Sequence, residues 1–166
     1  MGRRSIKENK SVYMIAREKN GLTREKASEK IDGISPSRLE KLENGRTTMQ
    51  PEDVVMLARA YKEPKLCNYY CTHECALGRK KTPELAEKEL PQIAIELVNA
   101  VSLLYREKDQ ILQIAEDGRV SREEYGDFSA LKETISKLIV SAQTLDLWLE
   151  TETAQGRIDA NGLNPA

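Results

Sequence analysis

An all-α fold is predicted for this chain, with a group of short helices followed by a long antiparallel helical hairpin. Aromatic residues make up 5% of the sequence and charged residues 32%, a composition that suits helices better than sheets. Residues that start and stop helices recur at short intervals in the first half. In the second half, apolar residues repeat at spacings of three and four over two long stretches.

Residues 21–45 predict two short helices joined by a tight turn. Thr23 can cap the first helix, because its hydroxyl can accept a backbone N–H that a helix start leaves unpaired. Gly33 ends that helix, since glycine tolerates the left-handed backbone of a sharp turn. Ser35 can cap the second helix, and Pro36 follows at its first position, where a missing N–H costs nothing.

The second of these helices combines an apolar inner face with a polar outer face. Leu39 and Leu42 are expected inside, while the outer face carries Ser37, Arg38 and Lys41. A helix with short polar and cationic groups near its N-terminus fits the major groove of DNA, where base edges display hydrogen-bond donors and acceptors. The pattern therefore predicts a helix that reads duplex DNA.

Residues from about Ser11 to Leu66, roughly a third of the chain, resemble the helix-turn-helix domain of phage-repressor regulators of the Cro/cI, XRE type. The turn at Ile31-Asp32-Gly33 is one residue longer than the usual Leu-Gly of that family, and Ser28 stands where a small Ala is common. The residues that carry the resemblance are Gly21-Leu22-Thr23, Glu25, Gly33-Ile34-Ser35, Leu39, Leu42-Glu43-Asn44-Gly45-Arg46, Pro51 and Leu57-Ala58.

The resemblance implies a five-helix, repressor-like helix-turn-helix domain that binds double-stranded DNA. On this interpretation Ser37, Arg38 and Lys41 contact base edges. Phosphate contacts are expected from the helix starts and from the loop after the second helix of the pair. The residues expected to make them are Thr23, Arg24, Ser35, Arg46, Thr47 and Thr48.

Charge is divided unevenly along the chain. Residues 1–81 contain 18 Lys and Arg against 11 Asp and Glu, whereas residues 82–166 contain 8 against 16. A basic half suits a polyanion such as DNA, and an acidic half would be repelled by it. Residues 1–10 are expected to be either a basic arm that reaches phosphates or a minor groove, or a disordered terminus.

Several classes of protein are disfavoured by the composition. No apolar run approaches membrane-spanning length, and no apolar core follows the basic start, as it would in a signal peptide. Three cysteines, an odd number, favour a reducing cytoplasm over a secreted disulfide framework. A single histidine, no glycine-rich phosphate loop and no closely spaced nucleophile–base pair argue against an enzyme.

Residues 66–78, LCNYYCTHECALG, place three cysteines four residues apart, which would put them on one face of a continuous helix. Three interpretations remain open. The cysteines can pack as small apolar residues, with no cofactor, or sense redox state. They can also bind zinc with the intervening histidine, although the spacing matches no standard zinc site. The candidate ligands are Cys67, Cys71, His73 and Cys75.

Two long helices joined at Asp117-Gly118 are predicted beyond residue 83. Their apolar faces are too wide for one hairpin to cover, so a homodimeric four-helix bundle is expected, which would set two DNA half-sites about 34 Å or a multiple apart. The alternative is a hairpin folded back on its own DNA-binding domain. The residues expected in the dimer interface are Leu97, Val101, Leu104, Ile111, Phe128, Leu131, Ile135, Leu138, Ala142, Leu145 and Leu149.

The sequence thus predicts a dimeric, cytoplasmic, sequence-specific regulator of transcription that binds double-stranded DNA, with a repressor and an activator as open alternatives. Its alternatives are a protein-interaction adaptor that uses the helical half, and a metal- or redox-responsive regulator that uses Cys67-Cys71-Cys75. The expected segments are a DNA-binding domain at 1–65, a cysteine helix and linker at 66–82, a dimerisation hairpin at 83–150 and a disordered tail at 151–166.

Overall fold

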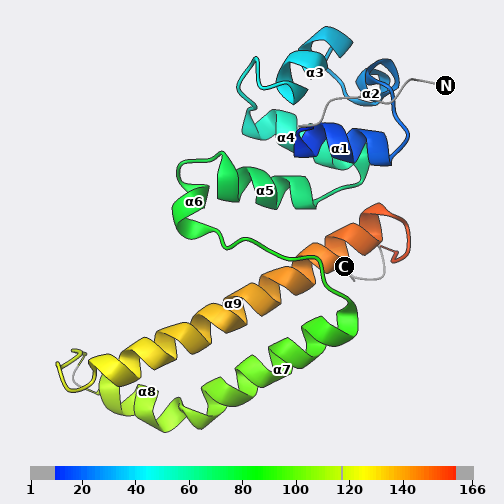
Figure 1. Cartoon of the computed structure of the whole chain (residues 1–166). Helices are drawn as coiled ribbons and strands as arrows, with labels where there is room; N and C mark the ends of the chain where they lie inside the picture. The colour runs from blue at the N-terminus through cyan, green and yellow to red at the C-terminus, as the bar shows by residue number, and fades with distance from the viewer. Residues whose placement is uncertain (1–9, 117, 160–166) are drawn as a thin grey trace. The chain divides into compact units, whose positions relative to one another are not determined.

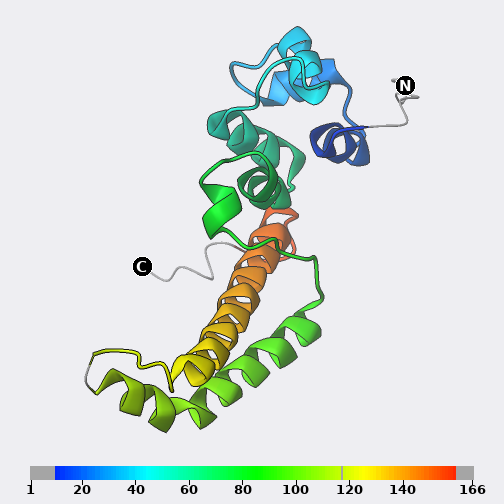
Figure 2. The same ribbon diagram turned by 60° about the vertical axis from the view of Figure 1, so that its left-hand side comes forward.

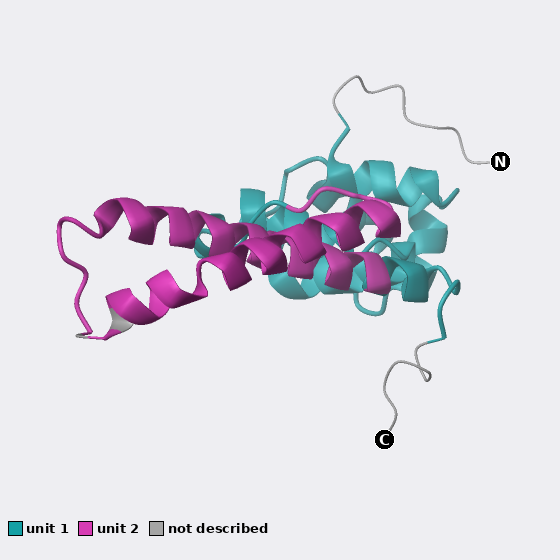
Figure 3. Cartoon of the chain, turned by 90° about the horizontal axis from the view of Figure 1, so that it is seen from below, with its two compact units in different colours: residues 1–84, 150–166 teal, residues 85–149 magenta. Residues whose placement is uncertain are grey.

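The computed structural model describes residues 10–116 and 118–159, and regular structure in these ranges is entirely α-helical (Figure 1). The predicted all-α fold class is confirmed. The chain divides into two compact units (Figure 3). The first takes the described residues up to Glu84 and from Glu150 onward, and the second is Leu85–Leu149. Within the described ranges no helix is long and apolar enough to cross a membrane.

The first unit contains a series of short helices, most of which begin at the residues that the sequence marks. The hydroxyls of Ser11, Thr23 and Ser35 each accept a backbone N–H three residues further on, which confirms the predicted caps at the last two. The helices are α1 (Val12–Lys19), α2 (Arg24–Lys30), α3 (Pro36–Glu43), α4 (Pro51–Tyr61), α5 (Lys65–His73) and α6 (Gly78–Lys81).

Helix α1 presents a different face to the core from the one that its apolar residues suggest. The apolar side chain of Ile15 is 51% exposed, while the charged side chain of Arg17 is buried. Arg17 takes an inner position because it forms an ion pair with Glu43 of α3. Most buried apolar side chains of this unit form one cluster: Tyr13, Ala16, Ala27, Ile31, Ile34, Leu39, Leu42, Met49, Val54, Leu57, Ala58, Tyr61 and Leu66.

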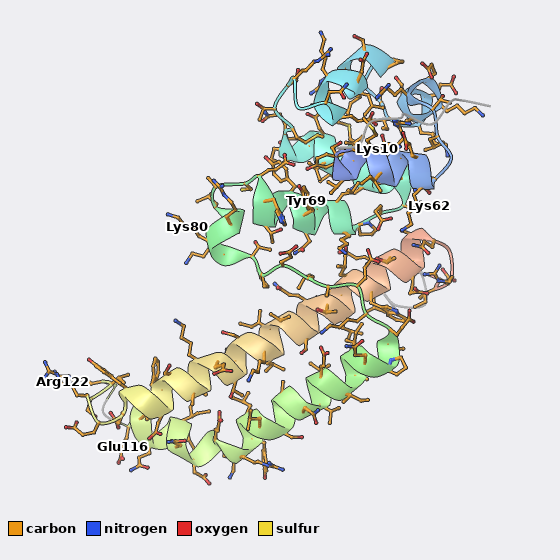
Figure 4. The ribbon with its side chains drawn as sticks, in the orientation of Figure 1. Lys10, Lys62, Tyr69, Lys80, Glu116 and Arg122 are labelled. Atoms are coloured by element: carbon orange, nitrogen blue, oxygen red, sulfur yellow. The ribbon has the colours of Figure 1, made fainter. Side chains whose placement is uncertain are left out.

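The second unit is the predicted helical hairpin, built from α7 (Leu90–Arg106), α8 (Lys108–Ala115) and most of α9 (Tyr125–Ala154). Pro91 lies in the first turn of α7, where proline is tolerated. Glu107 interrupts the first arm between α7 and α8. Glu116 and Arg122 mark the far end of the hairpin (Figure 4), and Asp117 of the predicted turn lies outside the described residues.

Helix α7 runs side by side with α9 in the opposite direction (Figures 1 and 2). Thr134 Oγ1 donates a hydrogen bond to Glu107 Oε1 across the contact, at 3.3 Å. One set of buried and half-buried residues along it recurs at spacings of three and four, and we call this set the hairpin seam. Its members are Ile93, Leu97, Ala100 and Leu104 of α7, Glu107 between the helices, Ile111 and Ile114 of α8, and Leu131, Thr134, Leu138, Ser141 and Leu145 of α9.

The two predicted terminal segments are only partly described. Of the basic arm, residues 1–9 lie outside the described residues, and so do residues 160–166 of the predicted tail. Helix α9 continues into that tail as far as Ala154. Beyond it, the guanidinium of Arg157 pairs with the carboxylate of Glu152. The first residues of the tail are therefore ordered by a helix and an ion pair.

Candidate DNA-binding surface

Helices α2 and α3 are connected by a turn that its own side chains stabilise. Gly33 adopts a φ of 81°, in the left-handed region that favours glycine. Ser28 Oγ donates a 2.5 Å hydrogen bond to the carbonyl oxygen of Ile34, so this hydroxyl bridges the turn. The chain departs from the usual helix-turn-helix sequence in its longer turn and in the serine at position 28. The hydroxyl of that serine forms a hydrogen bond across the longer turn.

A buried ionic network fixes α3 against α1 and α2. The carboxylate of Glu43, whose side chain is 0% exposed, accepts hydrogen bonds from Arg17 Nε at 2.5 Å and Arg17 Nη2 at 3.1 Å. It also accepts one from Arg24 Nε at 2.8 Å. Arg17 Nη1 donates to the carbonyl oxygen of Leu22 at 2.6 Å, which ties the α1–α2 loop into the same network. A buried carboxylate with three charged donors is fully compensated.

The network changes the ionisation of its neighbours. Burial alone would lower the pKa of Arg17, but the hydrogen bonds and charge of Glu43 outweigh it and raise that pKa above its ordinary value. Burial raises the pKa of Tyr61, and the nearby charge of Glu43 adds to the effect. In the described part of the chain the Tyr61 hydroxyl is buried without a hydrogen-bond partner.

The three residues predicted to contact bases lie on the outer side of α3, but not in the same state. Ser37 and Lys41 are exposed. Arg38 is half-buried, with 42% of its side chain exposed, and its Nη2 donates to both carboxylate oxygens of Asp53, at 2.7 and 2.9 Å. Asp53 also accepts the backbone N–H of Gln50 at the start of α4, at 3.2 Å. Asp53 thus holds the guanidinium of Arg38 through one nitrogen, while part of the side chain stays exposed.

The residues predicted to contact phosphate fall into two groups. Arg46, Thr47 and Thr48, in the loop after α3, are exposed. The hydroxyls of Thr23 and Ser35 cap α2 and α3, and Arg24 uses its Nε on Glu43, as described above. The sites of the first group are open to a phosphate, whereas those of the second already have intramolecular partners.

The cysteine segment does not form the helical row that the sequence suggests. Helix α5 ends at His73, so Cys75 lies beyond it, and the backbone N–H of Gly78 donates to Cys75 Sγ at 3.4 Å. His73 stacks on Tyr69, which Figure 4 shows on α5, with 4.3 Å between ring centroids. Cys67, Cys71, His73 and Cys75 all lie in the described ranges, where no group of three or more His, Cys, Asp or Glu side chains is placed to hold a metal ion.

The residues predicted for the dimer interface divide between two faces of the hairpin. The exposed members lie outside the hairpin seam, and they are Val101, Phe128, Ile135 and Ala142. The others are buried or half-buried within the chain, and they are Leu97, Leu104, Ile111, Leu131, Leu138, Leu145 and Leu149. Hydroxyl residues replace some of the expected apolar ones in the seam.

The sequence did not identify three charged residues that hold this surface in place through ion pairs. They are Arg17, Glu43 and Asp53. A signal for two of them exists. Arg17 directly follows Ala16 on the inner face of α1, and Glu43 lies four residues after buried Leu39 on α3. A charge among inward-facing residues on each of two neighbouring helices indicates a buried pair. Asp53 carries no such signal, because an acidic residue in the first turn of a helix is common.

One comparison with known proteins identifies this region. The helix-turn-helix family model matches residues 14–65, which run from α1 to the start of α5. No curated protein matches the chain, and no solved structure matches it. The matched region contains the capped α2–α3 pair, the ionic network and the outer face of α3. The chain therefore carries an XRE-type helix-turn-helix domain of DNA-binding transcription regulators, followed by a C-terminal helical domain.

Proposed function

We propose that this protein is a sequence-specific regulator of transcription in which α3 enters the major groove of duplex DNA. The observation that carries the proposal is the outer side of α3, where Ser37 and Lys41 are exposed beside a half-exposed Arg38. Each can donate hydrogen bonds to base edges, and an arginine can contact a guanine through two donors. The inner side of the same helix is fixed by Leu39, Leu42 and Glu43.

The loop that follows α3 supplies the contacts that set register on the backbone. Arg46, Thr47 and Thr48 are exposed, so a guanidinium, two hydroxyls and backbone N–H groups are available to phosphate oxygens. Such contacts carry no sequence information but raise affinity for any duplex. Each phosphate that a cation neutralises adds about −0.9 to the slope of log K against log salt.

Selection from a random pool of duplexes tests this proposal with the full-length protein. We expect an enriched sequence, and we expect Arg38→Ala to relax the preference at one base pair of it, at a cost of about 1–3 kcal/mol. Arg59→Ala is the matched control, because Arg59 is an exposed arginine on α4 outside the proposed surface. No enriched sequence with the wild-type protein would contradict the proposal.

We also propose that the hairpin joins two copies of the chain. The second unit exposes many large apolar side chains on its two long helices, far more than a stable monomer needs to leave in water. A two-fold dimer would present two helix-turn-helix domains to two half-sites. The exposed apolar side chains are Leu90, Ile95, Val98, Val101, Leu103, Tyr105, Leu112, Tyr125, Phe128, Ile135 and Ile139.

Sedimentation equilibrium at micromolar concentration tests the dimer. We expect the mass of two chains for the wild type and for Leu77→Glu, a control substitution at an exposed leucine of the first unit. Val98→Glu places a charge on an exposed apolar position of α7 and is expected to shift the mass toward one chain. A wild-type protein that sediments as a monomer would contradict this part of the proposal and leave the DNA-binding part standing.

A further inference from the structure

The two long helices of the hairpin each carry a second row of side chains outside the seam. Each member directly follows a seam residue along the chain, so it lies about 100° further round its helix. We call these rows the outer stripes. They are Ala94, Val98, Val101 and Tyr105 on α7, and Lys132, Ile135, Ile139, Ala142 and Asp146 on α9, and all of them are exposed.

The outer stripes lie on the same side of the hairpin. Both are displaced from the seam by one residue in the C-terminal direction, which is the same rotation on each helix. Helices α7 and α9 run in opposite directions (Figures 1 and 2). Because they face each other through the seam, equal rotations bring both stripes to one flank. This flank is strongly apolar in its middle, since the side chains of Val98 and Tyr105 are 62% and 69% exposed.

The stripe on α9 is symmetric about Ile139. Ile135 and Ala142 flank it at nearly equal distances, and beyond them Lys132 and Asp146 stand seven residues to either side. The outer charges are opposite in sign. Both are exposed, and no ion pair joins either of them to another described side chain. A helix with this pattern is complementary to a second copy of itself in the antiparallel direction.

The stripe on α7 has its midpoint between Val98 and Val101, within one helical turn of the same level. Val98 and Tyr105 lie on either side of Val101. The hydrogen bond between Thr134 and Glu107 fixes the register of the two arms. Five residues onward from Thr134 is Ile139, and five residues back from Glu107 is position 102, directly beside Val101. One two-fold axis across the hairpin can therefore pass through Ile139 of one stripe and close to Val101 of the other.

We propose that a second copy of this chain docks on this flank in an all-antiparallel four-helix bundle, with Ile139 against Ile139 and Lys132 paired with Asp146 of the other copy. This inference rests on the dimer proposed above and assigns its face, its direction and its charge pairs. Each charge pair occurs twice, because the interface is the same patch on both chains. The apolar middle supplies the driving force, and the charges at its edges select the antiparallel register.

The same geometry sets the distance between the points where the two α9 helices leave the bundle. Leu149 ends the second unit, ten residues beyond Ile139 on a continuous helix. At about 1.5 Å per residue it lies about 15 Å from the two-fold axis, so the two chains leave the bundle about 30 Å apart.

Charge reversal tests the inference directly with the full-length protein. Lys132→Glu and Asp146→Lys each replace two opposite-charge pairs by two like-charge pairs, so each variant alone is expected to weaken the dimer about tenfold. In an equal mixture of the two variants, a heterodimer has opposite charges at both edges. The introduced glutamate meets the introduced lysine at one edge, and the native Lys132 meets the native Asp146 at the other, so mixing is expected to restore dimerisation. The chain that carries both substitutions is expected to dimerise like the wild type.

Lys137→Glu is the matched control, because Lys137 lines a groove with Ala100 and Val140 on the hairpin's other flank. Sedimentation of each variant, alone and mixed, at about 50 mM salt gives the dissociation constants. Equal constants for the wild type and both single variants, or no gain on mixing weakened variants, would overturn the assignment while the dimer itself remained. A wild-type monomer would overturn the assignment and the dimer together, and selection on random duplexes would still report DNA binding separately.

Discussion

Replacing Glu43 by glutamine is expected to destabilise the helix-turn-helix domain strongly, although the two side chains have almost the same shape. Glu43 accepts three hydrogen bonds from Arg17 and Arg24, and its side chain is fully buried. The amide of glutamine keeps one acceptor oxygen and turns the other site into a donor that faces a guanidinium. Arg17, which is 5% exposed, then loses its counter-charge without gaining water.

The size of the effect follows from these contacts. Hydrogen bonds to charged groups contribute about 1.5–3 kcal/mol each, and breaking a buried ion pair by removing one partner costs about 3–5 kcal/mol. We expect Glu43→Gln to lose about 3–5 kcal/mol, a large part of the 5–15 kcal/mol that stabilises a typical domain. For a domain of this size that corresponds to a drop in melting temperature of at least about 12 °C.

Thermal and urea unfolding followed by circular dichroism measure this loss. Glu40→Gln is the matched control, because Glu40 is an exposed carboxylate on the same helix, and it is expected to change stability by less than about 0.5 kcal/mol. The double substitution Arg17→Met with Glu43→Leu removes both buried charges and is expected to recover most of the loss. A Glu43→Gln variant within about 1 kcal/mol of the Glu40→Gln control would refute the reasoning.

Three further predictions concern Tyr61, Cys67 and Gly78 of the first unit, and the third uses Gly126 of the second unit for comparison. Tyr61→Phe removes a buried hydroxyl without a partner and is expected to stabilise by about 1 kcal/mol. Because the pKa of Tyr61 is raised in the folded protein, the wild type also loses stability above about pH 10, where the phenol ionises only in the unfolded chain. Urea unfolding at a series of pH values should show a smaller fall in the free energy of unfolding for the variant. Cys67 should react with iodoacetamide more slowly than an unfolded cysteine at pH 8, as read by mass spectrometry, because burial raises the pKa of its thiol; equal rates would contradict this. Gly78→Ala is expected to lower the free energy of unfolding by about 1–3 kcal/mol, because the added methyl would lie 2.2 Å from the Cys71 carbonyl oxygen. Gly126→Ala, in the open first turn of α9, should be neutral or stabilising by up to about 1 kcal/mol. Similar losses for both variants in thermal unfolding would refute the argument.

Local chemistry in the sequence was enough to locate the helix-turn-helix pair. Thr23 and Ser35 cap α2 and α3 as predicted, and Gly33 turns the chain between them, because each of these effects depends on a few adjacent residues. The contact of Arg38 with Asp53 could not be predicted in this way. It joins α3 to α4 and depends on how the two helices pack.

The inner face of the hairpin was harder to predict, because polar residues occupy part of it. The apolar pattern groups Ile135 and Ala142 with Leu131 and Leu138 in the predicted dimer interface, whereas in the structure Thr134 and Ser141 lie in the seam beside these leucines. A hydroxyl on a helix can be buried at low cost when it donates to the carbonyl oxygen four residues earlier, as Ser141 does to Lys137 at 2.9 Å. A pattern based on apolar residues alone therefore points to the neighbouring face.

The cysteine segment departs from prediction because its helix is shorter than the spacing of the cysteines suggests. A continuous helix would align Cys67, Cys71 and Cys75, but α5 stops at His73. Gly78 then approaches the backbone of Cys71 so closely that any side chain would collide with it. A glycine that permits such an approach looks in the sequence like an ordinary turn residue.

The central claim is that the outer side of α3 contacts duplex DNA. Amide chemical shifts of the ¹⁵N-labelled full-length protein, recorded as a selected duplex is added, test it most directly. We expect the largest changes at Ser37 to Lys41 and at Arg46 to Thr48, with small changes along α7 and α9. Large changes confined to the hairpin or to α5 and α6, with α3 unaltered, would contradict the claim.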